Sequence, residues 1–347
     1  MRKAIEISLG LFFVFSLLLS CSEGKTKGDG DNQKINVIFD TDMGNDVDDA
    51  LALDMLYKYL DQGRINLLGI ATNKKSPYCV EYIDIMNTWY GYPDIPIGVV
   101  VDGTDMASED IFVQTVCQME KNGKPAFERS VKDYATLTTS VALYRKLLAA
   151  QEDNSVNIIS VGFSTNLAQL LDSQGDEFSP LTGKELVAQK VRLLSAMMGH
   201  FQDENFSEFN VNCDIPAAQK VVDEWPTPIA ASPFELGETI LYPASSIEND
   251  FKWKEPNPLV EGYKAYMKMP YDRQTWDLTS VLYVIESDKG FFGESPAGTI
   301  NIDDKGITRF TPDEKGKHKY LTVTDQQREQ IKDYFIQLIT QKPKKYQ

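Results

Sequence analysis

A short acidic turn between an apolar strand and an apolar helix constrains this chain more than any other feature. Residues 35–39 predict a buried strand, and residues 50–60 have the apolar spacing of a helix. Between them, residues 40–49 read Asp-Thr-Asp-Met-Gly-Asn-Asp-Val-Asp-Asp, so five carboxylates fall within ten positions. Gly44 supplies the backbone freedom that a tight turn needs. The sequence therefore predicts a strand, a turn and a helix whose N-terminus faces several carboxylates.

So many carboxylates in one turn need a counter-charge. Two carboxylates ~5 Å apart repel each other by ~3 kcal/mol at an effective dielectric constant of about 20. The N-terminus of a helix favours each anion by only ~0.3–1 kcal/mol. The helix cannot offset several such pairs, so the turn must bind a hard cation or hold protons. We predict a bound divalent metal ion.

Strand-like and helix-like segments alternate along the rest of the chain. Further strands are predicted at residues 65–71, 97–101, 156–161, 191–197 and 228–231. Helices are predicted at residues 78–90, 135–150, 166–171, 276–286 and 325–340, and one more begins at Asp214. Residues 299–323, with turn signals at 304–306 and 314–316, predict a β-hairpin or meander. The fold class that follows is α/β: an open, mostly parallel sheet flanked by helices, with a C-terminal β-hairpin insertion. Ligands are expected at the carboxyl ends of its strands.

The N-terminus has the pattern of an export signal. Residues 1–21 begin with Arg2 and Lys3, continue through an apolar run too short to span a membrane, and end at Cys21. This ending resembles a bacterial lipoprotein signal, in which Cys21 carries the lipid, although Leu19 stands where a small residue is more usual. An ordinary cleaved signal is the alternative. Residues 22–34 predict a flexible tether, and residues 35–345 a single domain. We therefore expect an exported protein, lipid-anchored to the periplasmic or surface face of the cell envelope.

Composition narrows the range of partners. The net charge of −16 argues against nucleic acid, because phosphate binding needs clustered Lys and Arg. No stretch after the signal is long and apolar enough to span a membrane, so membrane contact is expected only through the N-terminal lipid. The sequence leaves open whether the chain forms a homo-oligomer.

Four motifs in chain order resemble those of the inosine–uridine preferring nucleoside hydrolases. The first is the acidic turn, with its Asp-x-Asp, Gly and Asp-Asp-Ala pattern. The others are Val-Gly-Phe-Ser-Thr-Asn-Leu at 161–167, Glu-Phe-Asn at 208–210 and Arg-Gln-Thr-Trp-Asp-Leu at 273–278. The resemblance implies a nucleoside hydrolase-like fold and an N-ribosyl hydrolase. Such an enzyme would use Ca²⁺ and an activated water to cleave a nucleoside or other riboside into free base and ribose.

The resemblance also implies roles for individual residues. Calcium would be held by Asp42, Asp49, Asp277 and the backbone carbonyl of Thr165, an oxygen-only set that suits this ion. Asp42 would also be the general base, and Asp40 would orient the turn. The residues expected to hold the sugar hydroxyls are Asp48, Asn205, Glu208, Asn210 and Asp277.

Two segments depart from the family pattern. Many members place a His, the general acid for the leaving base, immediately before the last Asp ligand, and here that position is Trp276. We expect Trp276 to activate the base by stacking, with a core aromatic residue as the alternative. His200 could reach the pocket or lie in a solvated loop, and His318 is expected to be structural. Residues 71–76 also differ from the usual Thr-Thr-Val-x-Gly-Asn.

Two other interpretations follow from the same residues. The Asp-x-Asp of the acidic turn resembles that of haloacid-dehalogenase-type phosphatases, but Gly44 stands where those enzymes have Thr or Val, and Asp48 and Asp49 would have no role. An EF-hand fails because Gly44 occupies a ligand position. A non-catalytic, calcium-dependent nucleoside- or ribose-binding lipoprotein would explain both the missing histidine and the lipid anchor.

Overall fold

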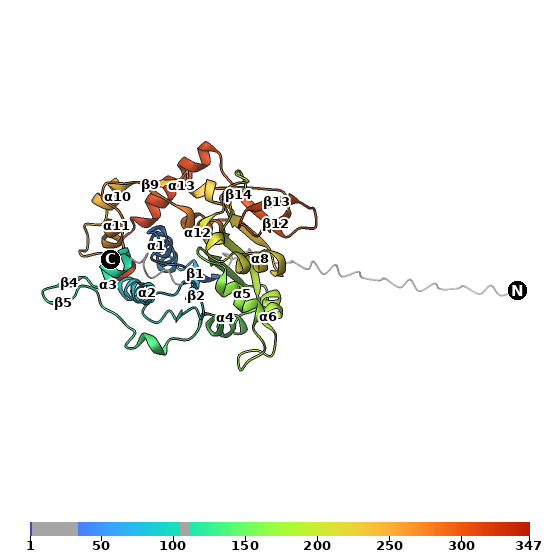
Figure 1. Ribbon diagram of the computed structural model, residues 1–347, viewed down its shortest axis with the longest axis horizontal. Helices are drawn as coiled ribbons and strands as arrows, with labels where there is room; N and C mark the ends of the chain where they lie inside the picture. The colour runs from blue at the N-terminus through green and yellow to red at the C-terminus, as the bar shows by residue number, and fades with distance from the viewer. Residues whose placement is uncertain (2–33, 105–110) are drawn as a thin grey trace. The chain divides into compact units, whose positions relative to one another are not determined.

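A computed structural model describes residue 1, residues 34–104 and residues 111–347 (Figure 1). The predicted lipidation site Cys21 and the tether up to residue 33 lie outside these described residues. Within them, no helix combines the length and the apolar character needed to cross a membrane.

The domain is built on a mostly parallel sheet. Its parallel strands, in spatial order, are β3 (Ile97–Gly98), β2 (Ile65–Thr72), β1 (Ile35–Thr41), β6 (Val156–Ser160), β7 (Val191–Met197), β8 (Ile229–Ser232) and β14 (His318–Thr322). Antiparallel strands complete the edge beyond β14, namely β12 (Gly298–Ile302), β13 (Thr308–Pro312) and β11 (Gly293–Glu294). The predicted α/β fold with an open, mostly parallel sheet is confirmed. The C-terminal hairpin, expected as an insertion, extends this same sheet.

The strand order places the acidic turn at the natural ligand position of such a sheet. β1 pairs with β2 on one side and with β6 on the other, so the direction in which strands are added reverses beside β1. In open α/β sheets, the crevice at the carboxyl ends of strands at this reversal is where ligands bind. The acidic turn, residues 40–49, begins at the carboxyl end of β1.

Helices cover both faces of the sheet, and β1 shows how the sequence divides them. Val37 and Phe39 pack into one apolar core, and Ile38, between them, packs into the other, because successive strand side chains point to opposite faces. The first core is shared with α1 (Asp48–Asp61), α2 (Pro77–Tyr90), α3 (Ile111–Cys117), α11 (Pro258–Tyr266), α12 (Trp276–Ile285) and α13 (Asp325–Ile339). The second is shared with α4 (Ser140–Ala149), α5 (Thr165–Asp172), α6 (Gly183–Lys190) and α8 (Ile215–Glu224) (Figure 1).

Shorter elements complete the domain. They are β4 (Glu120–Lys121), β5 (Lys124–Pro125), β9 (Leu241–Tyr242), β10 (Arg273–Gln274), α7 (Phe209–Cys213), α9 (Phe234–Gly237), α10 (Ala244–Asn249) and the 3₁₀ turns Tyr134–Thr136 and Lys344–Tyr346. α7, α9 and β10 carry residues of the candidate site.

Caps explain where the helices begin. Asp214 caps α8 as predicted, with its carboxylate accepting from the amide of Ala217 at 3.3 Å. The predicted start of α4 at residue 135 is wrong, because Thr139 accepts from the amide of Ala142 and begins the helix at Ser140. The predicted third strand is also shorter than expected and ends at Gly98.

Candidate active site

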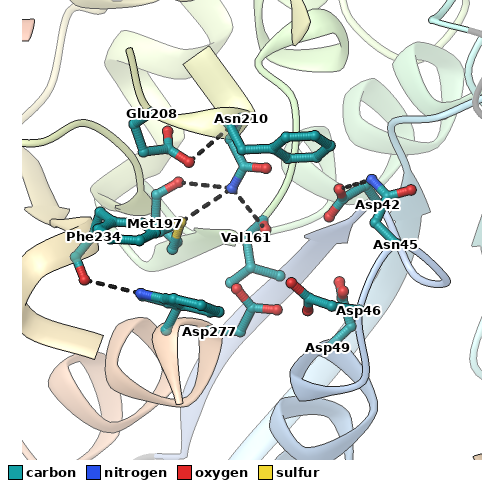
Figure 2. A pocket seen from close by; sticks show the side chains of 12 residues that line it. Asp42, Asn45, Asp46, Asp49, Val161, Met197, Glu208, Asn210, Phe234 and Asp277 are labelled. Carbon is teal, nitrogen blue, oxygen red and sulfur yellow. Dashed lines mark hydrogen bonds between the residues drawn. The ribbon is translucent and has the colours of Figure 1, made fainter. Parts of the chain in front are cut away.

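A cavity of about 120 Å³ lies at the carboxyl edge of the sheet (Figure 2). It has room for several water molecules, and hence for an ion together with a small ligand group. Four of the lining residues are aspartates, which we call the acidic floor: Asp42, Asp46, Asp49 and Asp277. Three others, Phe209, Phe234 and Trp276, are aromatic, and we call them the aromatic wall. Carboxylates and aromatic rings therefore line a single cavity.

The acidic turn is folded by its own side chains. Gly44 has a φ of +119°, a conformation that favours glycine. The Thr41 hydroxyl donates to the Asp49 carboxylate and accepts from the amide of Met43 at 3.1 Å. Val47 precedes α1 and provides no side-chain cap, so the first amides of the helix lie open to the neighbouring carboxylates. The turn thereby presents its acids toward the cavity.

Asp277 brings a second helix N-terminus to the same place. It lies in the first turn of α12, and its backbone N–H donates to Asp48 Oδ2 at 3.2 Å. The acidic floor is thus assembled from the acidic turn, the start of α1 and the start of α12, which lies more than 200 positions further along the sequence. Each helix end contributes positive potential, but far less than the floor requires.

The electrostatics of the floor favour the binding of a cation. Burial raises the pKa of Asp42 to about 7, with Lys74 opposing this rise and Asp46 adding to it. Burial and repulsion by the neighbouring carboxylates raise the pKa values of Asp49 and Asp277 well above their usual range. These carboxylates can be ionised together only beside a cation. Their hard oxygen atoms fit a divalent ion such as Ca²⁺ or Mg²⁺.

A chain of hydrogen bonds orients Asp42. The Asn45 side-chain amide donates to Asp42 Oδ2, and Lys74 Nζ donates to Asn45 Oδ1 at 2.8 Å. Lys74 is only 1% exposed and lies just after β2. Lys74 thus fixes which way the Asn45 amide faces, and that amide fixes a carboxylate oxygen of Asp42.

Asp40 holds the turn to the sheet. Its carboxylate accepts hydrogen bonds from Asn73, Tyr144 and Asn166, and burial raises its pKa to about 6 against these bonds. The turn after β6 packs so closely here that a Cβ on Gly162 would lie 2.6 Å from the Asp42 amide nitrogen. Asp40 is therefore engaged by the scaffold, in agreement with its predicted orienting role.

Glu208 and Asn210 are held rigidly above the floor. Glu208 accepts from the backbone amides of Gly199, Asn210 and Val211 at 2.8–3.2 Å, while burial raises its pKa to about 7. The Asn210 amide donates to the carbonyls of Val161 at 3.2 Å and Met197 at 3.3 Å, at the ends of β6 and β7 (Figure 2). Both side chains are placed to receive polar groups of a ligand.

The aromatic wall is anchored by a hydrogen bond. Trp276 Nε1 donates to the carbonyl of Phe234 at 2.9 Å, and the two rings stack with centroids 5.1 Å apart (Figure 2). Phe234 begins α9 directly after β8, and Phe209, 48% exposed, begins α7. The wall offers flat apolar surface to a ligand ring.

The structure gathers most of the predicted site residues but not all. Asp42, Asp49, Glu208, Asn210, Trp276 and Asp277 line the cavity. Asp48, Thr165 and Asn205 are not among its lining residues. Asp48 is bound by Arg273 at 2.8 Å, the Thr165 hydroxyl donates to Asp214, and Asn205 is exposed.

Neither histidine of the chain lines the cavity. His200 Nδ1 accepts from the amides of Gln202 and Asp203, and its ring stacks behind Phe234 at 5.8 Å. His318 Nδ1 accepts from the amide of Ile300 at 3.0 Å in the antiparallel edge of the sheet. His200 is held by its loop rather than solvated, and His318 is structural, as expected.

Several site residues were given no role by sequence reasoning. They are Asn45, Asp46, Lys74, Phe209, Phe234 and Arg273. Asp46 is one of the five carboxylates of the acidic turn and could have been found there. Phe209 stands between two predicted ligand-binding residues. Phe234 could have been found from its position just after a strand, at the edge where ligands bind.

The fold and the site together define a nucleoside hydrolase, an enzyme class that hydrolyses N-glycosidic bonds. The sequence model of the inosine-uridine preferring nucleoside hydrolase family matches residues 37–333, and the chain belongs to this family. No curated protein sequence matches the chain.

Solved structures agree at the level of fold. A plant nucleoside hydrolase is 17% identical, with a TM-score of 0.66 over 89% of this chain and 99% of that one. A purine-preferring ribonucleoside hydrolase from Gardnerella vaginalis is 15% identical, with a TM-score of 0.68 over 88% and 98%. An inosine-uridine preferring nucleoside hydrolase from Bacillus anthracis is 16% identical, with a TM-score of 0.65 over 88% and 99%.

Proposed function

We propose that this protein is a calcium-dependent hydrolase that cleaves the N-glycosidic bond of ribonucleosides to free base and ribose. The observation that carries the proposal is the acidic floor. Four carboxylates from the acidic turn and the starts of α1 and α12 line one cavity, and burial together with the neighbouring carboxylates raises the pKa values of Asp42, Asp49 and Asp277. In this proposal the ion is held by these three residues together with the carbonyl of Thr165.

The ion, when bound, would supply a Lewis acid that makes a water molecule more acidic. The remaining chemistry is assigned to side chains. Asp42 accepts the proton of the attacking water, with its carboxylate orientation set by Asn45. Bond cleavage develops oxocarbenium charge on the ribose, which the carboxylates of Asp277 and Glu208 stabilise. Asn210 and Glu208 hold sugar hydroxyls.

The leaving base would be received by the aromatic wall. Trp276 has no proton that can be donated near neutral pH, so its contribution is stacking rather than general acid catalysis. Both described histidines lie outside the cavity lining, which supports a mechanism without an imidazole acid. Leaving groups that depart without protonation should therefore react best.

The proposal is tested by incubating the purified protein with inosine, uridine and nitrophenyl riboside and measuring free base or nitrophenol together with reducing sugar. Stoichiometric release of both products, lost in the Asp42→Asn variant, is expected. Tight nucleoside binding without any product would instead favour a calcium-dependent binding lipoprotein, the alternative that the missing histidine suggests.

We also propose that the chain is exported and anchored to the cell envelope through a lipid on Cys21. The sequence pattern of residues 1–21 supports this. When cells that express the full chain are grown with radiolabelled palmitate, the protein should be labelled and membrane-bound. The Cys21→Ala variant should lose both the label and the membrane association. An unlabelled protein released in soluble form would point to an ordinary cleaved signal.

A further inference from the structure

A buried guanidinium lies against the acidic floor and has no role in the proposed reaction. Arg273, in β10, is 5% exposed. Its Nη2 lies 2.7 Å from Asp46 Oδ2 and 2.8 Å from Asp48 Oδ1, and its Nη1 donates to the Tyr266 hydroxyl at 3.2 Å. Its Cζ also lies 5.0 Å from the centroid of the Trp276 ring. Arg273 therefore joins the acidic turn to the start of α12.

The carboxylates that Arg273 contacts have the spacing of a cation site. Among the described residues, oxygen atoms of Asp46, Asp48 and Asp277 all lie within 4.8 Å of one another. Ligand oxygens lie 2.3–2.6 Å from Ca²⁺, so two of them on opposite sides of one ion are separated by about 5 Å. Two members of this trio, Asp46 and Asp48, are ion-paired with the same guanidinium nitrogen. We call Asp48 and the four residues of the acidic floor the acidic cluster. Its Asp46–Asp48 side already carries a cation supplied by the chain, the guanidinium of Arg273.

We propose that Arg273 is a built-in cation that occupies the Asp46–Asp48 side of the cluster and reserves the other side for a single divalent ion. The inference rests on the proposed function, in which Asp42, Asp49 and Asp277 hold that ion. A guanidinium suits the task because it is always charged and presents several N–H groups in a fixed plane. The guanidinium also lies against the Trp276 ring, so the same group that pairs with Asp46 and Asp48 helps to position the aromatic wall.

Replacing Arg273 should open a second cation site. In Arg273→Met, a side chain of similar length without charge removes the counter-charge from Asp48, which is buried, and from Asp46, whose side chain is 33% exposed, beside Asp277. A divalent ion should then bind this trio as well. Equilibrium dialysis of the chelator-treated protein against Ca²⁺, with elemental analysis, should give one ion per wild-type chain and two per Arg273→Met chain. Millimolar guanidinium chloride should displace the extra ion and restore a ratio of one.

A matched control is available in the same chain. Arg145 is 2% exposed and ion-paired with Asp176 at 2.6 Å, and within the described part of the chain its hydrogen bonds go to Ser173, Asp176, Ser179 and Leu181, none of which lines the cavity. Arg145→Met also removes a buried guanidinium, so it should lower stability but keep the ratio at one ion per chain. Melting curves add a second readout, because Ca²⁺ should recover much of the stability lost in Arg273→Met and none of that lost in Arg145→Met.

The possible outcomes distinguish the proposed role of Arg273 from the proposed calcium site on which it rests. No bound ion in the wild-type chain would contradict the calcium site itself. One ion in the wild type and one of equal affinity in Arg273→Met would overturn the role of Arg273 alone. If Arg273→Met does not fold without Ca²⁺, recovery of its melting transition on adding Ca²⁺ supports the inference, and a variant that stays unfolded at saturating Ca²⁺ overturns it.

Discussion

The acidic floor and the aromatic wall line one cavity, yet they are specified in different ways. The floor is encoded mainly by one contiguous turn, with Asp277 added by the start of α12. Both segments lie within residues 37–333, which match the model of the family to which the chain belongs. The wall is assembled from the starts of three separate helices, and its Trp276 stands where the family resemblance leads us to expect a histidine. The comparison suggests that attack on the sugar is constrained by charge, whereas departure of the base depends on replaceable apolar contacts.

The largest effect is expected on the floor. Asp42→Asn keeps the shape of the side chain but removes the general base, so kcat should fall by ~10³-fold or more, within the ~10²–10⁴-fold range of such catalysis. Steady-state assays with each riboside would measure the loss. Asp54→Asn is a suitable control, because Asp54 is equally buried in α1 but binds Tyr90 and Lys58 away from the cavity. Near-normal turnover of Asp42→Asn on every substrate would refute the assigned mechanism.

Asp49→Asn should separate metal binding from catalysis. An ion that binds only the folded state at 100 times its Kd contributes ~2.7 kcal/mol to the free energy of unfolding. Chelation should therefore lower the melting temperature of the wild type, and it should leave that of Asp49→Asn nearly unchanged. Calorimetry with and without chelator measures this difference. If the chelator does not change the melting temperature of the wild type, that result would argue against the calcium site.

The two hydrogen bonds that link Lys74 to Asn45 and Asn45 to Asp42 predict an intermediate effect on kcat. A hydrogen bond to a charged group contributes ~1.5–3 kcal/mol, so losing the amide that orients Asp42 should lower kcat by about 10- to 150-fold in Asn45→Ala. KM should change little, because Asn45 acts on the base rather than on the substrate. Asn66→Ala, at an exposed asparagine of β2, is the control. A rise in KM with kcat unchanged would mark Asn45 as a substrate-binding residue instead.

The smallest effect is expected on the wall. Aromatic stacking contributes ~0.5–1.5 kcal/mol beyond burial, so Trp276→Ala should slow the cleavage of inosine and uridine about two- to tenfold more than that of nitrophenyl riboside. Trp276→Phe, which keeps a ring, should recover most of this difference. Equal losses on all substrates would show that Trp276 only packs the wall.

The sequence predicted the structure best where the residues that act together are also neighbours in the chain. Alternating apolar runs predicted the parallel sheet, and the five carboxylates of one turn predicted the floor, because like charges cannot be crowded without a cation. Asp277 and Glu208 were found through the family resemblance, and both line the cavity.

Residues that act through tertiary contacts could not be predicted in this way. Asp48 is expected to hold a sugar hydroxyl, and the sequence gives no sign that Arg273, 225 positions away, also binds its carboxylate. Lys74 and Phe234 reach the site only because β2 and β8 end beside β1 and β7 in the folded sheet. Local propensity also misplaced the start of α4, because the cap at Thr139 outweighed the apolar pattern before it.

The central claim is that the acidic floor works only with one divalent ion, and a single titration tests it most directly. The rate of base release from inosine is measured on chelator-treated protein as free Ca²⁺ is raised. The account predicts no detectable release without Ca²⁺ and a rise that saturates as a single class of site fills. A substantial rate without metal, unchanged across the titration, would contradict it.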